Sequence, residues 1–273
     1  MSHPMRRHRA LSWPTYKGTS QYVGTSPSGQ VSVYVDPSLG APGLQNAQDL
    51  ANDADRVVGA NNSIFASQGG RVNVIVFALG GQTDGGGGAD HSACDYKCGG
   101  DIEVCASFGQ PARVSALFEA ELSECSMGGN LCGVSTGEAL SRWCAAAVSG
   151  NALADFATAP TWAQDGMPDY INKTDSTDQN PDSTGCGMAF LSWLQRLGSP
   201  LNRIAPAMVN LGTNGTLAQL YAELTSDSQT SAWPKFQAAV KALPNIVNDD
   251  PFGAGSGAGR RVLAKPRTRS RRR

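Results

Sequence analysis

Histidine is scarce in this sequence, and its scarcity limits the metal chemistry that the chain can carry out. Among 273 residues there are three histidines, and His3 and His8 lie in a basic N-terminal stretch, which leaves His91 for the expected core. A catalytic zinc site built from two His and one Glu therefore lacks a donor. The chain also has no G-x-S-x-G elbow, and the Gly-rich residues 84–90 lack the G-K-[ST] ending of a phosphate loop.

Long apolar runs are missing as well. No stretch approaches the roughly 20 apolar residues that a membrane-spanning helix needs. Residues 1–17 begin with basic side chains but no apolar segment follows, so they do not have the pattern of a secretory signal. The composition, rich in Gly, Ser, Thr and Asn with seven cysteines, favours an extracytoplasmic protein. These features leave the localisation unknown.

Acidic residues are absent from both ends of the chain, although the formal net charge is only −1. Residues 1–17 hold four Lys/Arg and residues 260–273 hold eight, so residues 18–259 carry 10 Lys/Arg against all 23 Asp/Glu, a charge of −13. We expect a disordered basic segment at 1–30, and a Gly-rich linker with a basic disordered tail at 248–273. Such a tail can make nonspecific contacts with polyanions such as nucleic acid, but a solvated end without a dedicated partner is favoured.

Apolar periodicity predicts an α+β protein between these ends. Strands are expected at 31–36, 71–79 and 101–107, and helices at 44–65, 112–127, 135–149, 183–197, 202–210, 216–224 and 232–243. The expected domain covers 31–247. Its N-terminal lobe, about 31–128, combines a small mixed sheet with helices, and its C-terminal lobe, about 129–247, is mainly helical.

Two glutamate-containing segments form the most informative motif. Residues 117–124 read L-F-E-A-E-L-S-E, and Glu138 follows in T-G-E-A-L-S. The first segment resembles the zinc-protease helix signature H-E-L-S-H, with Ala120 and Glu124 in place of the two histidines, which a helix sets one turn apart. The second resembles the helix that supplies the third zinc ligand in the gluzincin branch of the zincin-like metallopeptidase superfamily. The resemblance covers roughly residues 31–243.

This resemblance implies roles for the three glutamates. Glu121 stands at the catalytic general-base position, and Glu124 and Glu138 stand at ligand positions. Since Ala120 has no donor atom, Glu121 is expected to be vestigial. Three carboxylates suit Ca²⁺, Mg²⁺ or Mn²⁺ better than Zn²⁺, so any of these divalent cations is an alternative to the favoured expectation of no cofactor. In the favoured case Glu124 is hydrogen-bonded to other groups, with Arg142 or Arg113 as candidate partners.

The cysteines allow two further hypotheses. Cys125 and Cys132 flank a Gly-rich turn between the two motif helices, and a disulfide between them would fix that turn. His91, Cys94, Cys98 and Cys105 have donor types that suit structural zinc, but their irregular spacing favours disulfides or buried thiols. The same expectations place Glu119 on the surface, the Gly-rich residues 84–90 beside the cleft, and Trp162, Trp193 and Trp233 in the core or cleft wall.

Three classes of function fit these patterns. The favoured one is a metallopeptidase-like pseudoenzyme that has lost zinc-dependent proteolysis and binds a peptide or a protein in the residual cleft. The second is an active metal-dependent hydrolase or peptidase with a carboxylate-bound cation, since a water-activating Glu needs a nearby Lewis acid. The third is an extracytoplasmic surface-binding module.

Overall fold

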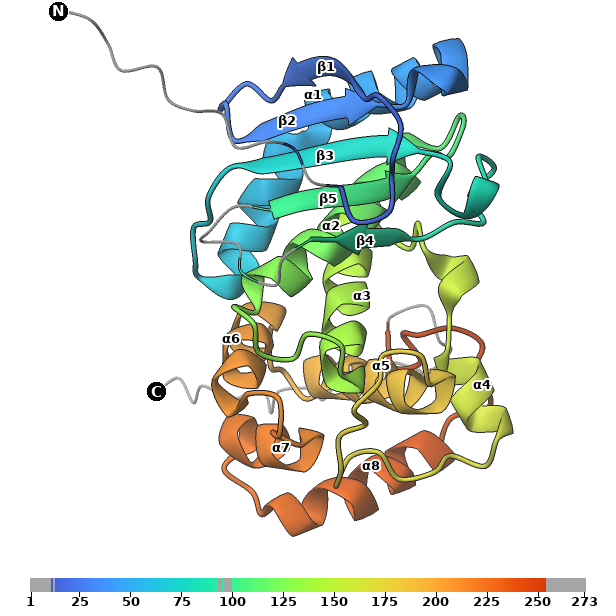
Figure 1. Cartoon of the computed structure of the whole chain (residues 1–273). Helices are drawn as coiled ribbons and strands as arrows, with labels where there is room; N and C mark the ends of the chain where they lie inside the picture. Colours follow the sequence, from blue (N-terminus) through green and yellow to red (C-terminus); the bar gives the residue numbers. More distant parts are fainter. Residues whose placement is uncertain (1–10, 12, 93–94, 96–99, 254–273) are drawn as a thin grey trace, which may run out of the picture.

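The computed structural model describes residues 11, 13–92, 95 and 100–253, and its N-terminal half is built on a five-stranded mixed sheet (Figure 1). The strands are β1 (Gln21–Thr25), β2 (Val31–Val35), β3 (Val72–Phe77), β4 (Ala89–His91) and β5 (Gly100–Cys105), in the order β1-β2-β3-β5-β4. The three central strands are parallel, and β1 and β4 pair antiparallel at the edges. Together with the helices that follow, this sheet confirms the predicted α+β class.

Two helices cover one face of the sheet because its three central strands turn β-branched side chains toward them. α1 (Gly40–Phe65) packs on β2 and β3, and α2 (Pro111–Ser126) packs on β5. This inner face is made of fully or almost fully buried side chains: Val31, Val33, Val35, Val72, Val74, Val76, Ile102 and Val104. The alternation of these residues along each strand has the period of two that a sheet requires.

The N-terminal segment covers part of the opposite face. Glu103, in the middle of β5, is fully buried there. Its carboxylate accepts hydrogen bonds from the backbone N–H groups of Thr15 and Tyr16, at 2.9 and 2.6 Å, and from the Thr15 hydroxyl at 2.7 Å. The expectation that residues 1–30 are disordered is therefore wrong for the described residues from Trp13 onward, because a buried carboxylate binds this segment and β1 extends the sheet.

The second half of the chain is helical. It consists of α3 (Ser135–Ser149), α4 (Ala159–Gln164), α5 (Pro181–Arg196), α6 (Leu201–Leu211), α7 (Leu217–Thr225) and α8 (Ala232–Lys241). Two helix starts are fixed by local sequence: the Asn180 side chain accepts the N–H of Asp182 at α5, and Thr216 forms a capping box with Gln219 at α7. The core of this half is aromatic, with Trp162 stacked on Phe236.

Helix α3 lies at the centre of the molecule and joins the two halves (Figure 1). It packs against α2 on the sheet side and against α5 on the helical side. The contact with α5 is close: a Cβ atom added at Gly187 would lie 2.7 Å from the Ala139 Cβ, a distance that real Cβ atoms do not reach. A small residue at this position therefore allows α5 to approach the helix that carries Glu138.

Helix α2 is enclosed on almost every side, since it contacts α1, α3 and the sheet. One consequence is that Glu119 is fully buried, and neither carboxylate oxygen has a hydrogen-bond partner among the described residues. Burial raises the pKa of Glu119 well above its ordinary value, although the charge of Arg56 opposes this effect. The expectation of a surface position for Glu119 is wrong because small alanines let α3 cover that face of the helix.

The last described residues are also packed. Asp249 accepts the N–H groups of Thr158 and Ala159 at 2.8 and 2.7 Å, and Phe252 is buried in the helical core. The expected linker that begins at residue 248 therefore begins too early, because residues 249–252 are held by these contacts. No helix in the described part of the chain is long and apolar enough to span a membrane.

Candidate functional site

A cleft of about 640 Å³ lies between the edge strand β4, the helices α2 and α3, and the chain around the start of α5. Its charged lining consists of Asp90, His91, Glu121, Glu124, Glu138, Arg142 and Asp178. Glu121 and Glu124 come from one face of α2 because three residues make nearly one helical turn. Glu138 comes from the first turn of α3. The structure thus places the three glutamates of the sequence motif around one cavity.

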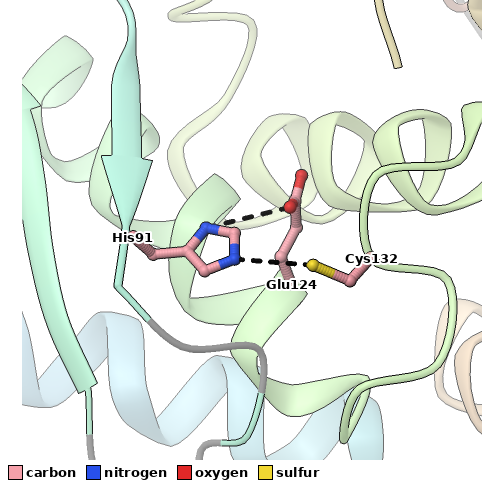
Figure 2. A group of neighbouring side chains, drawn as sticks. All are labelled: His91, Glu124 and Cys132. Atoms are coloured by element: carbon pink, nitrogen blue, oxygen red, sulfur yellow. Dashed lines mark hydrogen bonds and ion pairs between the residues drawn. The ribbon is translucent and has the colours of Figure 1, made fainter. Parts of the chain in front are cut away.

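The imidazole of His91 lies against the two carboxylates of α2. Its Nδ1 is 2.7 Å from the Glu121 Oε2 and 3.8 Å from the Glu124 Oε2. Figure 2 shows the ring between Glu124 on one side and Cys132 on the other, where the Cys132 Sγ is 3.9 Å from Nε2. β4 places the ring there, since His91 is the last residue of that strand and pairs with Ile102 of β5.

Burial and charge act in opposite directions on the His91–Glu121 pair. Burial lowers the pKa of His91, but the hydrogen bond to Glu121 and the charges of Glu121, Glu124 and Asp90 outweigh it, so the net shift is upward. Burial raises the pKa of Glu121, and the contact with His91 lowers it again in part. The short contact is thus a buried acid–base pair that holds a proton between the two groups.

Glu124 and Glu138 are acids whose protonated form the cleft favours. Burial, followed by the charges of Glu121 and Glu138, raises the pKa of Glu124 to about 8. Burial raises the pKa of Glu138 to about 7 against the opposing charge of Arg142, with further upward contributions from Glu121 and Asp178. Near neutral pH these two carboxyls therefore retain protons that exposed carboxyls would have lost.

The arginines expected beside Glu124 pair elsewhere. Arg142 is 4.0 Å from Glu138 and 3.6 Å from Asp249, and Arg113 forms an ion pair with Asp155. Among the described residues, the ion-pair partner of Glu124 is His91. The predicted partners Arg142 and Arg113 are therefore wrong.

The donor set does not fit the zinc site that the motif would imply. Ala120 lines the cleft without a donor atom, and the Nδ1 of His91 is already bonded to Glu121. Within the described chain, three potential donors, His91, Glu124 and Cys132, lie within 4.8 Å of one another. Cys132 is disulfide-bonded, so its sulfur cannot supply the thiolate that binds metals.

The predicted disulfide between Cys125 and Cys132 is wrong. Cys125 is a buried thiol whose sulfur faces β5, where a Cβ added to Gly100 would lie 3.7 Å from it. The Gly-rich turn brings Cys132 to His91 instead. Two of its glycines, Gly128 and Gly129, have φ values of 66° and 84°, a backbone conformation that favours glycine and lets the chain turn here.

The alternative zinc set of His91, Cys94, Cys98 and Cys105 is not brought together in the described chain. Cys94 and Cys98 lie outside the described residues. The Cys105 sulfur bonds to the carbonyl oxygens of Leu79 and Gln82. His91 pairs with Ile102, three residues along β5 from Cys105, and directs its ring at Glu121 instead.

Two cleft residues are not marked by any sequence pattern. Arg142, which the sequence suggests as a partner of Glu124, follows Glu138 by four residues and so shares its helix face. Asp178 and Thr184 approach from the loop before α5 and from α5 itself, and no motif marks them. Thr184 is 1% exposed, and its hydroxyl has no hydrogen-bond partner among the described residues.

Comparisons with known proteins add a distant structural likeness. No protein-family model matches the sequence, and no curated protein matches it. A solved structure of yeast LTA4 hydrolase in complex with bestatin aligns with 83% of this chain at 12% identity and a TM-score of 0.40. The aligned part is 38% of the length of that chain. The function is therefore argued from the residues of the cleft.

Proposed function

We propose that this protein is a zincin-like scaffold that has lost zinc-dependent proteolysis and binds a peptide or a protein segment in its cleft. The observation that carries this proposal is the 2.7 Å contact between His91 and Glu121. The carboxylate at the general-base position is thus occupied by an imidazole from a neighbouring strand. One residue before it, Ala120 offers no atom to a metal.

The chemistry of water activation supports the loss of hydrolysis. A general base must accept a proton from water, and zinc-dependent hydrolysis also needs a Lewis acid to stabilise the developing oxyanion. The Oε2 of Glu121 is hydrogen-bonded to His91, so this oxygen is not free to accept a proton from water. The donors near it do not make a site for zinc, because Cys132 is in a disulfide and Ala120 is inert. The same cleft can still bind without catalysing a reaction.

The shape and lining of the cleft support a peptide ligand. A volume of about 640 Å³ lies within the range of roughly 300–1,000 Å³ found for ligand pockets. Its wall combines apolar side chains, Leu117, Leu153 and Phe156, with the polar groups of Ser141 and Thr184. Apolar surface can hold a ligand side chain while the polar groups satisfy its backbone.

The second candidate, a hydrolase with a carboxylate-bound cation, draws support from a separate observation. Burial and the charges of neighbouring carboxylates, Glu121 among them, raise the pKa values of both Glu124 and Glu138, and a divalent cation would favour their charged forms. A cation close to Glu121 would have to displace the proton that His91 shares with it. Hydrolysis by this route would be sensitive to chelators.

Filling the cleft tests the proposed function. Ala120→Phe places a ring in the cleft, and Ala41→Phe, at an exposed position in α1, is the matched control. A fluorescent pool of synthetic decapeptides is titrated with each protein, and binding is followed by anisotropy. We expect Ala120→Phe to weaken binding at least tenfold and Ala41→Phe to leave it unchanged. Equal binding by all three proteins, or chelator-sensitive cleavage of the pool by the unmodified chain, contradicts the proposal.

A further inference from the structure

We propose that reduction of the Cys132 disulfide opens a zinc site beside the cleft, with His91, Cys132 and Glu124 as its three protein ligands. This site differs from the one that the zinc-protease signature implies, because His91 belongs to β4 and Cys132 to the turn between α2 and α3. The inference goes beyond the proposed function, since it concerns metal binding and its redox control and does not depend on a peptide ligand.

Three elements that are separate in the sequence bring these donors together (Figure 2). His91 is the last residue of β4, Glu124 lies in the last turn of α2, and Cys132 lies in the turn that precedes α3. One ligand atom from each of the three side chains lies within 4.8 Å of the other two. Imidazole, carboxylate and thiolate are the groups that bind zinc in proteins, and three of them leave a fourth tetrahedral position for water.

The spacing of the imidazole and the sulfur is close to that of a zinc site. The Cys132 Sγ is 3.9 Å from the His91 Nε2. Tetrahedral zinc with a nitrogen ligand at about 2.0 Å and a sulfur ligand at about 2.3 Å holds the two atoms about 3.5 Å apart. A shift of a few tenths of an ångström therefore brings this pair to the spacing that zinc requires. Rotation about the side-chain bonds of Glu124 completes the set, because its carboxylate already lies within 4.8 Å of both partners.

Glu121 orients the imidazole for this role. Its Oε2 lies 2.7 Å from the His91 Nδ1, so Nδ1 carries the shared proton and Nε2, which faces Cys132, is the nitrogen that can bind a metal. Zinc-binding histidines generally donate their second N–H to a carboxylate in this way, which fixes the tautomer and the ring. Because Glu121 is engaged with His91, zinc at this site has no free general base beside it, in agreement with the loss of hydrolysis proposed above.

The disulfide controls whether the site can form. A metal binds the thiolate form of cysteine, and Cys132 is disulfide-bonded. Cys132 is half-buried in a turn whose other residues include four exposed ones, so a reductant in solution can reach it: Gly128, Gly129, Asn130 and Gly133. The four free cysteines of the described chain are all buried, which leaves Cys132 as the accessible sulfur among these five: Cys105, Cys125, Cys144 and Cys186.

Reduction and metal binding are two balanced steps. A dithiol opens the disulfide by thiol–disulfide exchange. The S–S bond breaks, the two cysteine sulfurs gain two electrons and two protons, and the dithiol becomes a disulfide. Zinc then binds the Cys132 sulfur, whose proton passes to solvent. Oxidation by a small-molecule disulfide reverses both steps and releases the zinc, so metal occupancy follows the thiol–disulfide balance around the protein.

Zinc titration of the oxidised and the reduced full chain tests the inference. The reduced form is prepared with a dithiol, which is removed by gel filtration under argon, and zinc affinity is measured by competition with a chromophoric chelator. We expect the reduced chain to bind zinc at this site at least tenfold more tightly than the oxidised chain. Equal zinc affinity of the two forms would overturn the inference.

Cobalt in place of zinc identifies the sulfur ligand. A thiolate ligand gives Co²⁺ an intense charge-transfer absorption in the near ultraviolet, which imidazole and carboxylate ligands alone do not give. In the reduced chain, Cys132→Ala should abolish this absorption, and the matched control Cys186→Ala, at a buried thiol in α5, should retain it. Cys132→Ser takes the place of Cys132→Ala if circular dichroism shows that the alanine variant is unfolded. Absorption that persists without the Cys132 sulfur contradicts the proposed ligand set.

Variants of the other two ligands complete the test. In the reduced chain, His91→Gln and Glu124→Gln should each lower the zinc affinity at least tenfold. Glu223→Gln, at an exposed position in α7, should leave it unchanged. Zinc affinity that both His91→Gln and Glu124→Gln retain would place the metal elsewhere and overturn the inference.

Discussion

The raised pKa of Glu124 makes a direct prediction about stability. With a pKa of about 8 in the folded protein against an ordinary value of 4.5, this carboxyl keeps its proton on folding over a range where the unfolded chain has released it. Stability therefore falls as pH rises from about 4.5 through 8, because the folded state binds more protons than the unfolded state. Glu124→Gln removes this titration while preserving the size of the side chain.

The magnitude follows from the size of the shift. Each pH unit across this window changes the free energy of unfolding by about 1.4 kcal/mol for one proton of difference. Full retention of one proton between pH 5 and pH 8 would amount to about 4 kcal/mol. The charges of Glu138 and His91 also contribute to the pKa of Glu124, so their own titration over this range changes the figure. We expect the stability of Glu124→Gln relative to wild type to rise by about 2–4 kcal/mol from pH 5 to pH 8. At pH 5 the two proteins should differ little.

Urea unfolding provides the assay, because Trp162 and Trp193 are buried in the helical core and report its loss through their fluorescence. Unfolding curves are measured at pH 5, 6, 7 and 8. The slope of the free energy of unfolding against urea concentration is checked to be equal for wild type and variant. Glu223→Gln serves as an exposed control. A constant stability difference between Glu124→Gln and wild type across this range would refute the assignment of a raised pKa to Glu124.

Four other variants test three separate parts of the structure. Glu119→Met should raise the free energy of unfolding by about 1–3 kcal/mol, measured by urea denaturation, since it replaces a buried carboxyl that lacks hydrogen bonds; a loss of stability would contradict this account of the site. Glu103→Ala should make the N-terminal segment at least tenfold more susceptible to trypsin, and unchanged digestion would mean that the segment is held by other contacts. Thr15→Val removes the hydrogen bond from the Thr15 hydroxyl to Glu103 and should lower the free energy of unfolding by about 1 kcal/mol. Ala120→His combined with Glu124→His should bind one zinc per chain together with Glu138, and a folded, zinc-free double variant would count against Glu138 as a third ligand.

Much of the fold was predictable because its central elements bury one face. The helices α1 and α3 and the strands β2, β3 and β5 show clear periods of 3.6 or 2 residues in the sequence, whereas α2 and α5 are buried on nearly every side. β4, with three residues, is too short to show a period, and β1 is a short, exposed edge strand. Their positions depend on pairing with neighbouring strands, so the sequence alone did not reveal them.

The site was predictable only in part. The spacing of Glu121, Glu124 and Glu138 predicts two helices that share a cleft, and the structure places all three around one cavity. The position of His91 depends on the pairing of β4 with β5, which no local pattern encodes. Glu119 was misplaced because α2 is buried on nearly all sides, a state that a helix-face argument cannot detect from one segment.

Zinc-dependent proteolysis by the unmodified full chain is the most direct test of the central claim. An unfolded protein carrying a quenched fluorophore is incubated with the chain, first with added zinc and then with a chelator. The contact between His91 and Glu121 and the missing donor at Ala120 predict no cleavage above the buffer rate in either condition. Cleavage that increases with zinc and stops with the chelator would contradict the account.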